Sequence, residues 1–312
     1  MRRYHAIADC RANVWGGGRS MKLGIHAMAW TNHWSNASLD LIDRAKELGL
    51  DFIEIPLLDL DDVDPAAIRA RLEAVGFDAV TSTVLNAATD LTADDPERRA
   101  AGVDYLTRCV EATAAMGARQ FSGVIYSELG RRPAFRPGER HWTWATEGLR
   151  IVADRAAERG VTVAIEPVNR YETFLVNTAA QAVQLCTMID RPNVAIHLDT
   201  YHMNIEEKRW DEPIRQAGAR LCHLHLCEND RGIPGTGLVD WDTLFAALGA
   251  LGYDGYAALE SFVDVSDDMR PATPVWRDLA PSGDELVREG TRFLRAKAAA
   301  VGLRTGTPTL MA

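Results

Sequence analysis

Four residues that can bind metal or transfer protons stand at equivalent places, each at the end of a short apolar run. They are Glu166, Asp199, His225 (or its neighbour His223) and Glu260. If the runs are neighbouring parallel strands, three carboxylates and an imidazole meet in one poorly hydrated mouth, where the carboxylates raise one another's pKa. A divalent cation removes that cost, and this donor set favours Mn²⁺, Mg²⁺ or Co²⁺ over a thiolate zinc site. The sequence therefore predicts a divalent metal site.

The elements that must position these residues alternate along the chain. Continuous apolar runs separated by helical periodicity predict parallel strands covered on both faces. Eight such units in about 250 residues are typical of a single (β/α)₈ TIM barrel, whose active site lies at the carboxyl ends of the strands. The predicted strands span residues 22–30, 52–57, 79–84, 120–126, 161–167, 194–200, 220–227 and 255–262. The predicted helices span 38–49, 65–76, 96–117, 141–160, 178–189, 241–252 and 283–300.

No linker or low-complexity segment divides the chain, so we predict one catalytic barrel over residues 21–300. Residues 1–20 are interpreted as a disordered extension or an upstream start before a natural Met21, and 301–312 as a C-terminal tail. Glycines stand where helix C-caps are needed before the next strand: Gly49, Gly76, Gly117, Gly160 and Gly252.

Composition narrows the class of protein. The 312 residues are 47% hydrophobic and carry a formal net charge of -10, which repels phosphate backbones and argues against a nucleic-acid partner. No run of about 18 apolar residues exists, so no membrane span is predicted. Five cysteines without paired spacing indicate thiols in a reducing, cytoplasmic compartment.

Each candidate also has a structural interpretation. A glutamate after a strand is usually a helix cap or a rim charge, but independent charges would not fall on four successive strand ends. His197 and His223 are expected to face outward and fill the core between strands and helices. Cys222 and Cys227 flank histidines without zinc-site spacing and are expected to be small core residues.

Four motifs resemble one known family. "EPVNRYETF" (166–174), "HLDTYHMNIEE" (197–207), "HLHLCENDRGIPGTG" (223–237) and "LESF" (259–262) are similar to the ketose 3-epimerases, which include D-tagatose, D-allulose (D-psicose) and L-ribulose 3-epimerases. These enzymes belong to the xylose-isomerase-like TIM barrels. The resemblance covers roughly residues 22 to 300 and departs from the family in the extension before Met21 and in the loop 127–140.

The resemblance implies metal-dependent epimerisation of free ketoses at C3 through an enediolate, of the D-allulose/D-fructose, D-tagatose/D-sorbose or L-ribulose/L-xylulose type. It implies one divalent ion, Mn²⁺ first, with Co²⁺ or Mg²⁺ as alternatives. Glu166 and Glu260 would be both metal ligands and the acid/base pair. For Arg231, pairing with Glu228 or Asp230 stays an alternative to a substrate contact. The implied ligands are Glu166, Asp199, His225 and Glu260, and the groups holding O1 and O2 are Glu172, His202 and Arg231.

Further polar and aromatic residues are candidates for the sugar pocket. Trp30 and Trp34 could cover the sugar's carbon face or pack against helices. Glu54 is expected to point into the barrel, where it binds a hydroxyl or pairs with a buried group such as His26. Asn86, after the third strand, is a weaker hydroxyl contact.

Two other functions compete with the ketose 3-epimerase. An aldose–ketose isomerase or a polyol dehydratase of the same superfamily would use the same metal on other carbons. An endonuclease of that superfamily would need a trinuclear zinc cluster and a basic surface, which eight histidines and a net charge of -10 disfavour. We also expect a homo-oligomer, either dimer or tetramer, formed through the region 205–210.

Overall fold

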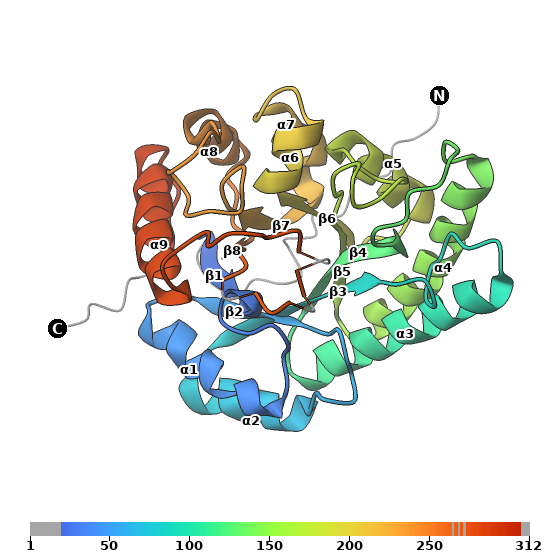
Figure 1. Ribbon diagram of the computed structural model, residues 1–312, viewed down its shortest axis with the longest axis horizontal. Coiled ribbons are helices and arrows are strands. Elements are labelled where there is room, and N and C mark those ends of the chain that lie inside the picture. Colours follow the sequence, from blue (N-terminus) through green and yellow to red (C-terminus); the bar gives the residue numbers. More distant parts are fainter. Residues whose placement is uncertain (1–19, 264, 268, 271–272, 307–312) are drawn as a thin grey trace.

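The structure is a computed structural model that describes residues 20–263, 265–267, 269–270 and 273–306. The predicted extension therefore lies almost wholly outside the described residues. Eight parallel strands close into a barrel in chain order, and β8 pairs with β1 (Figure 1). This confirms the predicted fold class. The strands are β1 (Lys22–His26), β2 (Phe52–Pro56), β3 (Asp78–Leu85), β4 (Gln120–Glu128), β5 (Thr162–Ile165), β6 (Val194–Asp199), β7 (Leu221–Leu226) and β8 (Tyr256–Leu259).

Helices surround this barrel and bury the outer faces of the strands, so every residue of β2, β5, β6, β7 and β8 is buried. Burial on both faces explains why the strands read as continuous apolar runs. The helices are α1 (Asp40–Glu47), α2 (Pro65–Val75), α3 (Pro96–Ala115), α4 (Glu139–Glu158), α5 (Ala179–Ile189), α6 (Thr200–Glu206), α7 (Glu212–Ala217), α8 (Trp241–Leu251) and α9 (Gly283–Ala300). Within the described ranges, none of these helices has the length and apolarity to cross a membrane.

Local signals set the helix ends. The side chain of Asp64 accepts hydrogen bonds from the backbone N–H groups of Ala66 and Ala67 at the start of α2, and Pro65 supplies a preset backbone angle. Gly76 ends the same helix with φ +61°, a left-handed conformation that costs glycine little. All five predicted cap glycines have positive φ.

Two short helices between β6 and β7 were not predicted. α6 and α7 have seven and six residues, too few for a clear 3.6-residue periodicity. α6 begins directly at the end of β6, and Asp199 is its N-cap, accepting a hydrogen bond at Oδ1 from the backbone N–H of Tyr201 (2.7 Å). That contact leaves Oδ2 of Asp199 directed to the barrel mouth.

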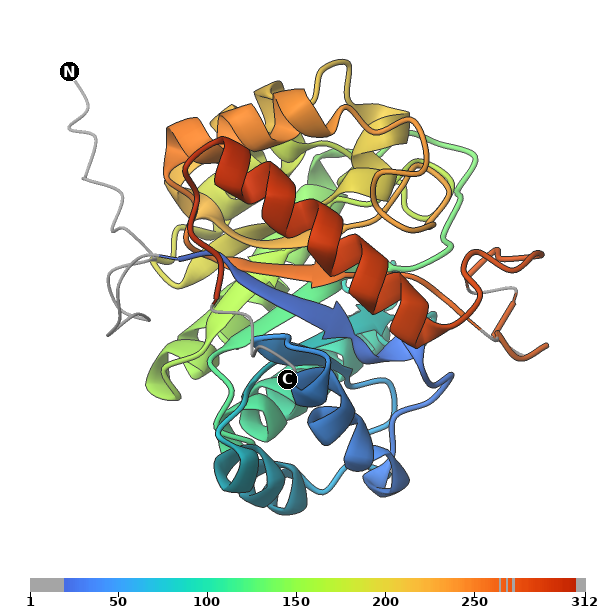
Figure 2. The ribbon, with the colours of Figure 1, turned by 90° about the vertical axis from the view of Figure 1, so that its left-hand side faces the viewer.

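The connection between β8 and α9 projects on the side to which the strands point. Figure 2 shows it standing out from the barrel beyond the N-terminal end of α9. At the opposite end the chain passes Met21, whose backbone N–H donates to the carbonyl of Arg304 (2.9 Å). The candidate site lies at the end of the barrel where the carboxyl ends of the strands meet, which we call the mouth.

Candidate active site

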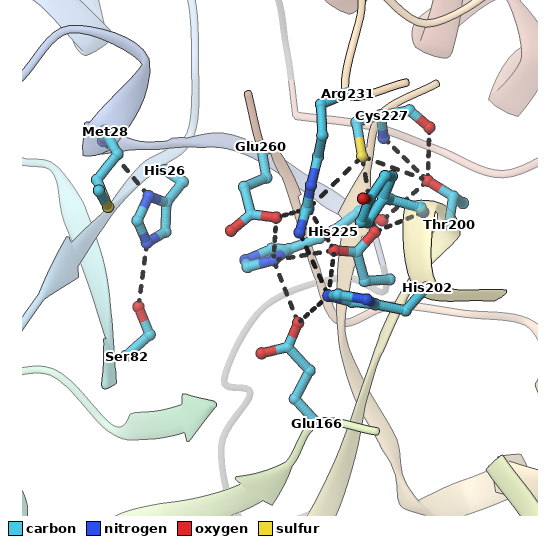
Figure 3. Close-up of polar contacts among 12 residues, drawn as sticks. His26, Met28, Ser82, Glu166, Thr200, His202, His225, Cys227, Arg231 and Glu260 are labelled. Atoms are coloured by element: carbon cyan, nitrogen blue, oxygen red, sulfur yellow. Dashed lines mark hydrogen bonds and ion pairs between the residues drawn. The ribbon is translucent and has the colours of Figure 1, made fainter. Parts of the chain in front are cut away.

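The four predicted ligands lie together at the mouth, delivered by β5 to β8 and the residues that directly follow them. Nδ1 of His225 lies 3.7 Å from Oε1 of Glu166, 3.9 Å from Oδ2 of Asp199 and 3.3 Å from Oε2 of Glu260. Figure 3 shows Glu166 and Glu260 approaching the His225 ring from opposite sides. None of the four is more than 8% exposed.

A hydrogen bond with the buried carboxylate of Glu54 sets the orientation of the His225 ring. Nε2 of His225 lies 2.9 Å from Oε2 of Glu54, and Nδ1 faces the carboxylates of the mouth, with Oε2 of Glu260 at 3.3 Å. Burial opposes ionisation of Glu54, but the His225 and His223 imidazoles hold its pKa well below the usual value. In protein metal sites, a ligating histidine typically pairs one ring nitrogen with a carboxylate and binds the metal through the other nitrogen.

The electrostatics of the mouth favour a cation. Burial, together with nearby carboxylates, raises the pKa of Glu166 well above its usual value and that of Asp199 to about 6. Burial by itself lowers the pKa of His225, but the carboxylates of Glu260 and Glu54 outweigh burial and raise that pKa well above its usual value. The site therefore stabilises positive charge in the space between Nδ1 of His225 and the carboxylates of Glu166, Asp199 and Glu260.

The donor set fits a divalent ion. Ligand atoms of Glu166, Asp199 and His225 lie within 4.8 Å of one another, and Glu260 stands beside them. Three carboxylates and one imidazole suit ions that prefer oxygen ligands. The residues thus form a buried group that could hold one such ion.

Arg231 is the cation that the structure places against this group. Its Nη1 donates to Oδ2 of Asp199 (2.6 Å) and also to Oε2 of Glu260. Burial acts against ionisation of Glu260, but Arg231 and His225 hold its pKa well below the usual value. The alternative partners are excluded, because Asp230 binds Arg277 (2.6 Å) and the backbone N–H of Gly232 (3.0 Å).

The other alternative partner, Glu228, is buried within the loop that carries Arg231. Its carboxylate accepts hydrogen bonds from the backbone N–H of Gly235 (2.6 Å) and from the indole N–H of Trp241 (2.7 Å). Arg231 itself adopts φ +70°. Glu228 therefore shapes the loop that directs the guanidinium into the mouth.

A cavity of about 140 Å³ opens beside the cluster. The predicted sugar-binding residues Glu172, His202 and Arg231 all line it. Nδ1 of His202 accepts a hydrogen bond from the backbone N–H of Asn169 (3.1 Å), and its Nε2 lies 3.3 Å from Nη2 of Arg231. Both side chains are thereby held facing the cavity.

Glu54 does not line this cavity, so the hydroxyl contact predicted for it is not supported. It is fully buried, and its Oε2 lies 2.8 Å from Nε2 of His223 as well as 2.9 Å from Nε2 of His225. The side chain of His26, the partner proposed from the sequence, makes no hydrogen bond with the Glu54 carboxylate; its contacts are to Ser82 and Met28. Glu54 instead joins two histidines beneath the site.

The prediction that His197 and His223 face outward is wrong. Their rings lie 4.3 Å apart between centroids, and the His197 ring lies 4.0 Å from that of His225. Residues two apart on a strand share a face, so His223 must point to the same side as His225. The three imidazoles form a layer inside the barrel below the carboxylates.

Neither tryptophan lines the cavity, so the packing alternative describes their placement. Trp30 lies under the guanidinium of Arg44 (5.0 Å to the ring centroid), and Trp34 is buried in the core.

Asn86, the weaker candidate for a hydroxyl contact, instead caps a turn: its side chain accepts a hydrogen bond from the backbone N–H of Ala88 (2.9 Å). Sequence reasoning also missed His26 as a lining residue, although its position at the end of β1 matches that of the residues at the ends of β5 to β8.

Comparison with known proteins agrees with this geometry. Residues 42–297 match the xylose isomerase-like TIM barrel family, and the chain belongs to it. A ketose 3-epimerase of Arthrobacter globiformis is 39% identical over 286 residues, covering 90% of this chain and 98% of that protein. An L-ribulose 3-epimerase of Methylomonas sp. (strain DH-1) is 36% identical, covering 89% and 98%.

The same similarity holds in three dimensions. The crystal structure of a D-allulose 3-epimerase from Methylomonas sp. in complex with D-allulose superposes with a TM-score of 0.85 at 35% identity, covering 90% of this chain and 98% of that one. Within the barrel family, the chain is thus a carbohydrate epimerase of the ketose 3-epimerase group.

Proposed function

We propose that the enzyme epimerises free ketoses at C3 with one divalent metal ion, interconverting pairs such as D-allulose/D-fructose, D-tagatose/D-sorbose or L-ribulose/L-xylulose. The observation that carries this proposal is the pair Glu166 and Glu260, which approach the same imidazole nitrogen from opposite sides of the His225 ring (Figure 3) and both line the cavity. The names of the relatives support a ketose substrate and reaction at C3.

Glu166, Asp199, His225 and Glu260 would hold the ion, with Mn²⁺ the first choice and Co²⁺ or Mg²⁺ as alternatives. When bound, the ion would supply Lewis-acid stabilisation of negative charge on the substrate's carbonyl oxygen, a contribution of several kcal/mol. Nδ1 of His225, which faces three carboxylates, and the crowding of those buried carboxylates support this assignment.

The protein's own groups then transfer the protons. One of Glu166 and Glu260 removes the C3 proton from its face, which leaves an enediolate. The other carboxyl group delivers a proton to the opposite face, and the two exchange roles with the direction of reaction. Arg231, His202 and Glu172 would hold the O1 and O2 end of the sugar and orient C3 between the carboxylates.

The position of isotope exchange tests the reaction. In D₂O, the product ketose is expected to carry deuterium at C3 and none at C1, because the proton that arrives comes from a different carboxyl group than the one that accepted the leaving proton. NMR of the isolated product measures both positions. A shielded carboxyl group that returns its proton before exchange regenerates the starting ketose, so protium kept at C3 of the recovered substrate fits the proposal.

Deuterium at C1, or an aldose among the early products, would contradict the C3 assignment and favour the aldose–ketose isomerase. A sugar that keeps its carbon skeleton but loses water would favour the dehydratase. A matched incubation without enzyme, at the same pD and temperature, sets the background of chemical exchange.

Glu54 gives a second test that reports on the metal site directly. Glu54→Gln is expected to weaken metal binding by roughly 10- to 100-fold, as is usual when the group that orients a ligating histidine is changed. Calorimetric titration of the metal-free protein with Mn²⁺ measures this. The exposed Glu212→Gln is the matched control, and equal affinities in the two variants would show that Glu54 does not support the site.

Assembly and location stay predictions. We propose a homo-oligomer that acts in the cytoplasm, on the basis of the sequence alone.

A further inference from the structure

The cavity has two chemically different walls. The wall from β5 to β8 carries the charged residues to which the proposed function already assigns roles. The wall from β1 to β4 is mainly apolar, and the polar side chains in it are His26, Ser82 and Thr83. These three side chains are therefore the candidates for polar recognition on that side.

Thr83 is already occupied. Its hydroxyl lies 2.8 Å from the carbonyl oxygen of Leu57 and 2.7 Å from the hydroxyl of Tyr105. Tyr105 donates to the same Leu57 carbonyl (2.6 Å). The hydroxyl of Thr83 therefore satisfies the protein's own groups, and His26 and Ser82 remain.

Hydrogen bonds determine the tautomer of His26. Its Nδ1 accepts from the backbone N–H of Met28 (3.4 Å), so Nδ1 carries no proton and Nε2 must be the protonated nitrogen of the neutral ring. Nε2 lies 3.3 Å from Oγ of Ser82 and donates to it (Figure 3). The Ser82 hydroxyl accepts this bond, and the structure gives its own hydrogen no acceptor among the described residues.

The pair is close to the reacting centre but separate from it. The His26 ring stands edge-on to the His225 ring at 5.7 Å between centroids, and both His26 and Ser82 line the cavity. His26 is 5% and Ser82 7% exposed. A hydroxyl donor without a partner in a buried, otherwise apolar wall costs free energy that a bound hydroxyl would recover.

We propose that the His26–Ser82 pair binds a hydroxyl group of the ketose beyond C3 and thereby selects among ketoses. This inference rests on the proposed function. If the O1 and O2 end lies against Arg231 and His202, the carbons after C3 extend toward the wall from β1 to β4. There, Ser82 donates to the sugar oxygen, while His26 orients the serine through Nε2–H.

Deoxy sugars test the proposal. The panel contains a ketohexose substrate and its 4-, 5- and 6-deoxy analogues, each assayed for kcat/KM at saturating Mn²⁺. The wild-type enzyme is expected to prefer the parent sugar over one of the analogues by about 10-fold, the size of one neutral hydrogen bond. Ser82→Ala is expected to bring that one ratio close to 1, by losing activity on the parent sugar and not on the analogue.

Two further variants separate recognition from structure. His26→Gln keeps an N–H donor near the position of Nε2 and is expected to retain part of the selectivity, whereas His26→Leu removes it. Ser122→Ala is the matched control, because Ser122 on β4 pairs in register with Ser82, is buried and does not line the cavity. Its ratios are expected to equal those of the wild type.

The outcomes are distinct. If Ser82→Ala and His26→Leu both keep every wild-type ratio, the pair does not read a hydroxyl and the inference is overturned. If Ser82→Ala fails to fold by circular dichroism, the comparison of His26→Gln with His26→Leu decides. If the wild-type enzyme exchanges no C3 hydrogen in any ketose, the proposed function itself fails. Unchanged Mn²⁺ affinity in Ser82→Ala is also expected, and a large loss would instead place the pair in the metal site.

Discussion

Removal of divalent metal is expected to abolish epimerase activity, and Mn²⁺ or Co²⁺ is expected to restore it. Three buried carboxylates repel a sugar's carbonyl oxygen, and a divalent ion held by them would supply the positive charge that binds and polarises it. Metal loss is also expected to lower the melting temperature by several degrees, because a ligand that binds only the folded state, at 100 times its Kd, adds about 2.7 kcal/mol.

The measurement pairs a chelator titration with activity and with differential scanning calorimetry. A chelator already saturated with Mn²⁺ is the control for direct effects of the reagent. Full activity in protein shown by elemental analysis to contain no metal would refute the proposed cofactor.

Glu260→Gln is expected to lower turnover by about 10²–10⁴-fold, the usual cost of losing an acid/base group. The amide keeps the shape of the side chain but cannot take the C3 proton, and it is a weaker metal ligand. Steady-state kinetics at saturating Mn²⁺ measure the loss, and the D₂O assay shows whether exchange at C3 is lost with it.

Glu54→Gln, assayed under the same saturating metal, is expected to cost much less turnover, because Glu54 touches His225 and not the cavity. The exposed Glu212→Gln is expected to behave as the wild type. Equal losses at Glu260 and Glu54 would show that the assignment of roles to the two glutamates is wrong.

The barrel was predictable because its signals are local. A strand buried on both faces needs a continuous apolar run, and a helix that ends before a strand needs a residue that accepts positive φ, as at Gly76 and Gly252. These requirements act over a few residues. The seven longer helices and all eight strands follow from them, whereas α6 and α7 are too short to show a period.

The gathering of Glu166, Asp199, His225 and Glu260 was also predictable, because parallel strands in chain order bring their carboxyl ends to one rim. The inward face of His223 follows from equally local geometry, because residues two apart on a strand share a face and His225 points into the barrel.

The sequence by itself therefore determined the fold and the set of charged groups at the mouth. Only the tertiary structure decided which buried residues orient these groups and which polar residues line the other wall of the cavity. Glu54 reaches His223 and His225 across 169 and 171 residues, and His26 reaches Ser82 across 56. Such contacts depend on the closure and register of the whole barrel, because strands that lie far apart in the chain become opposite walls only when β8 pairs with β1.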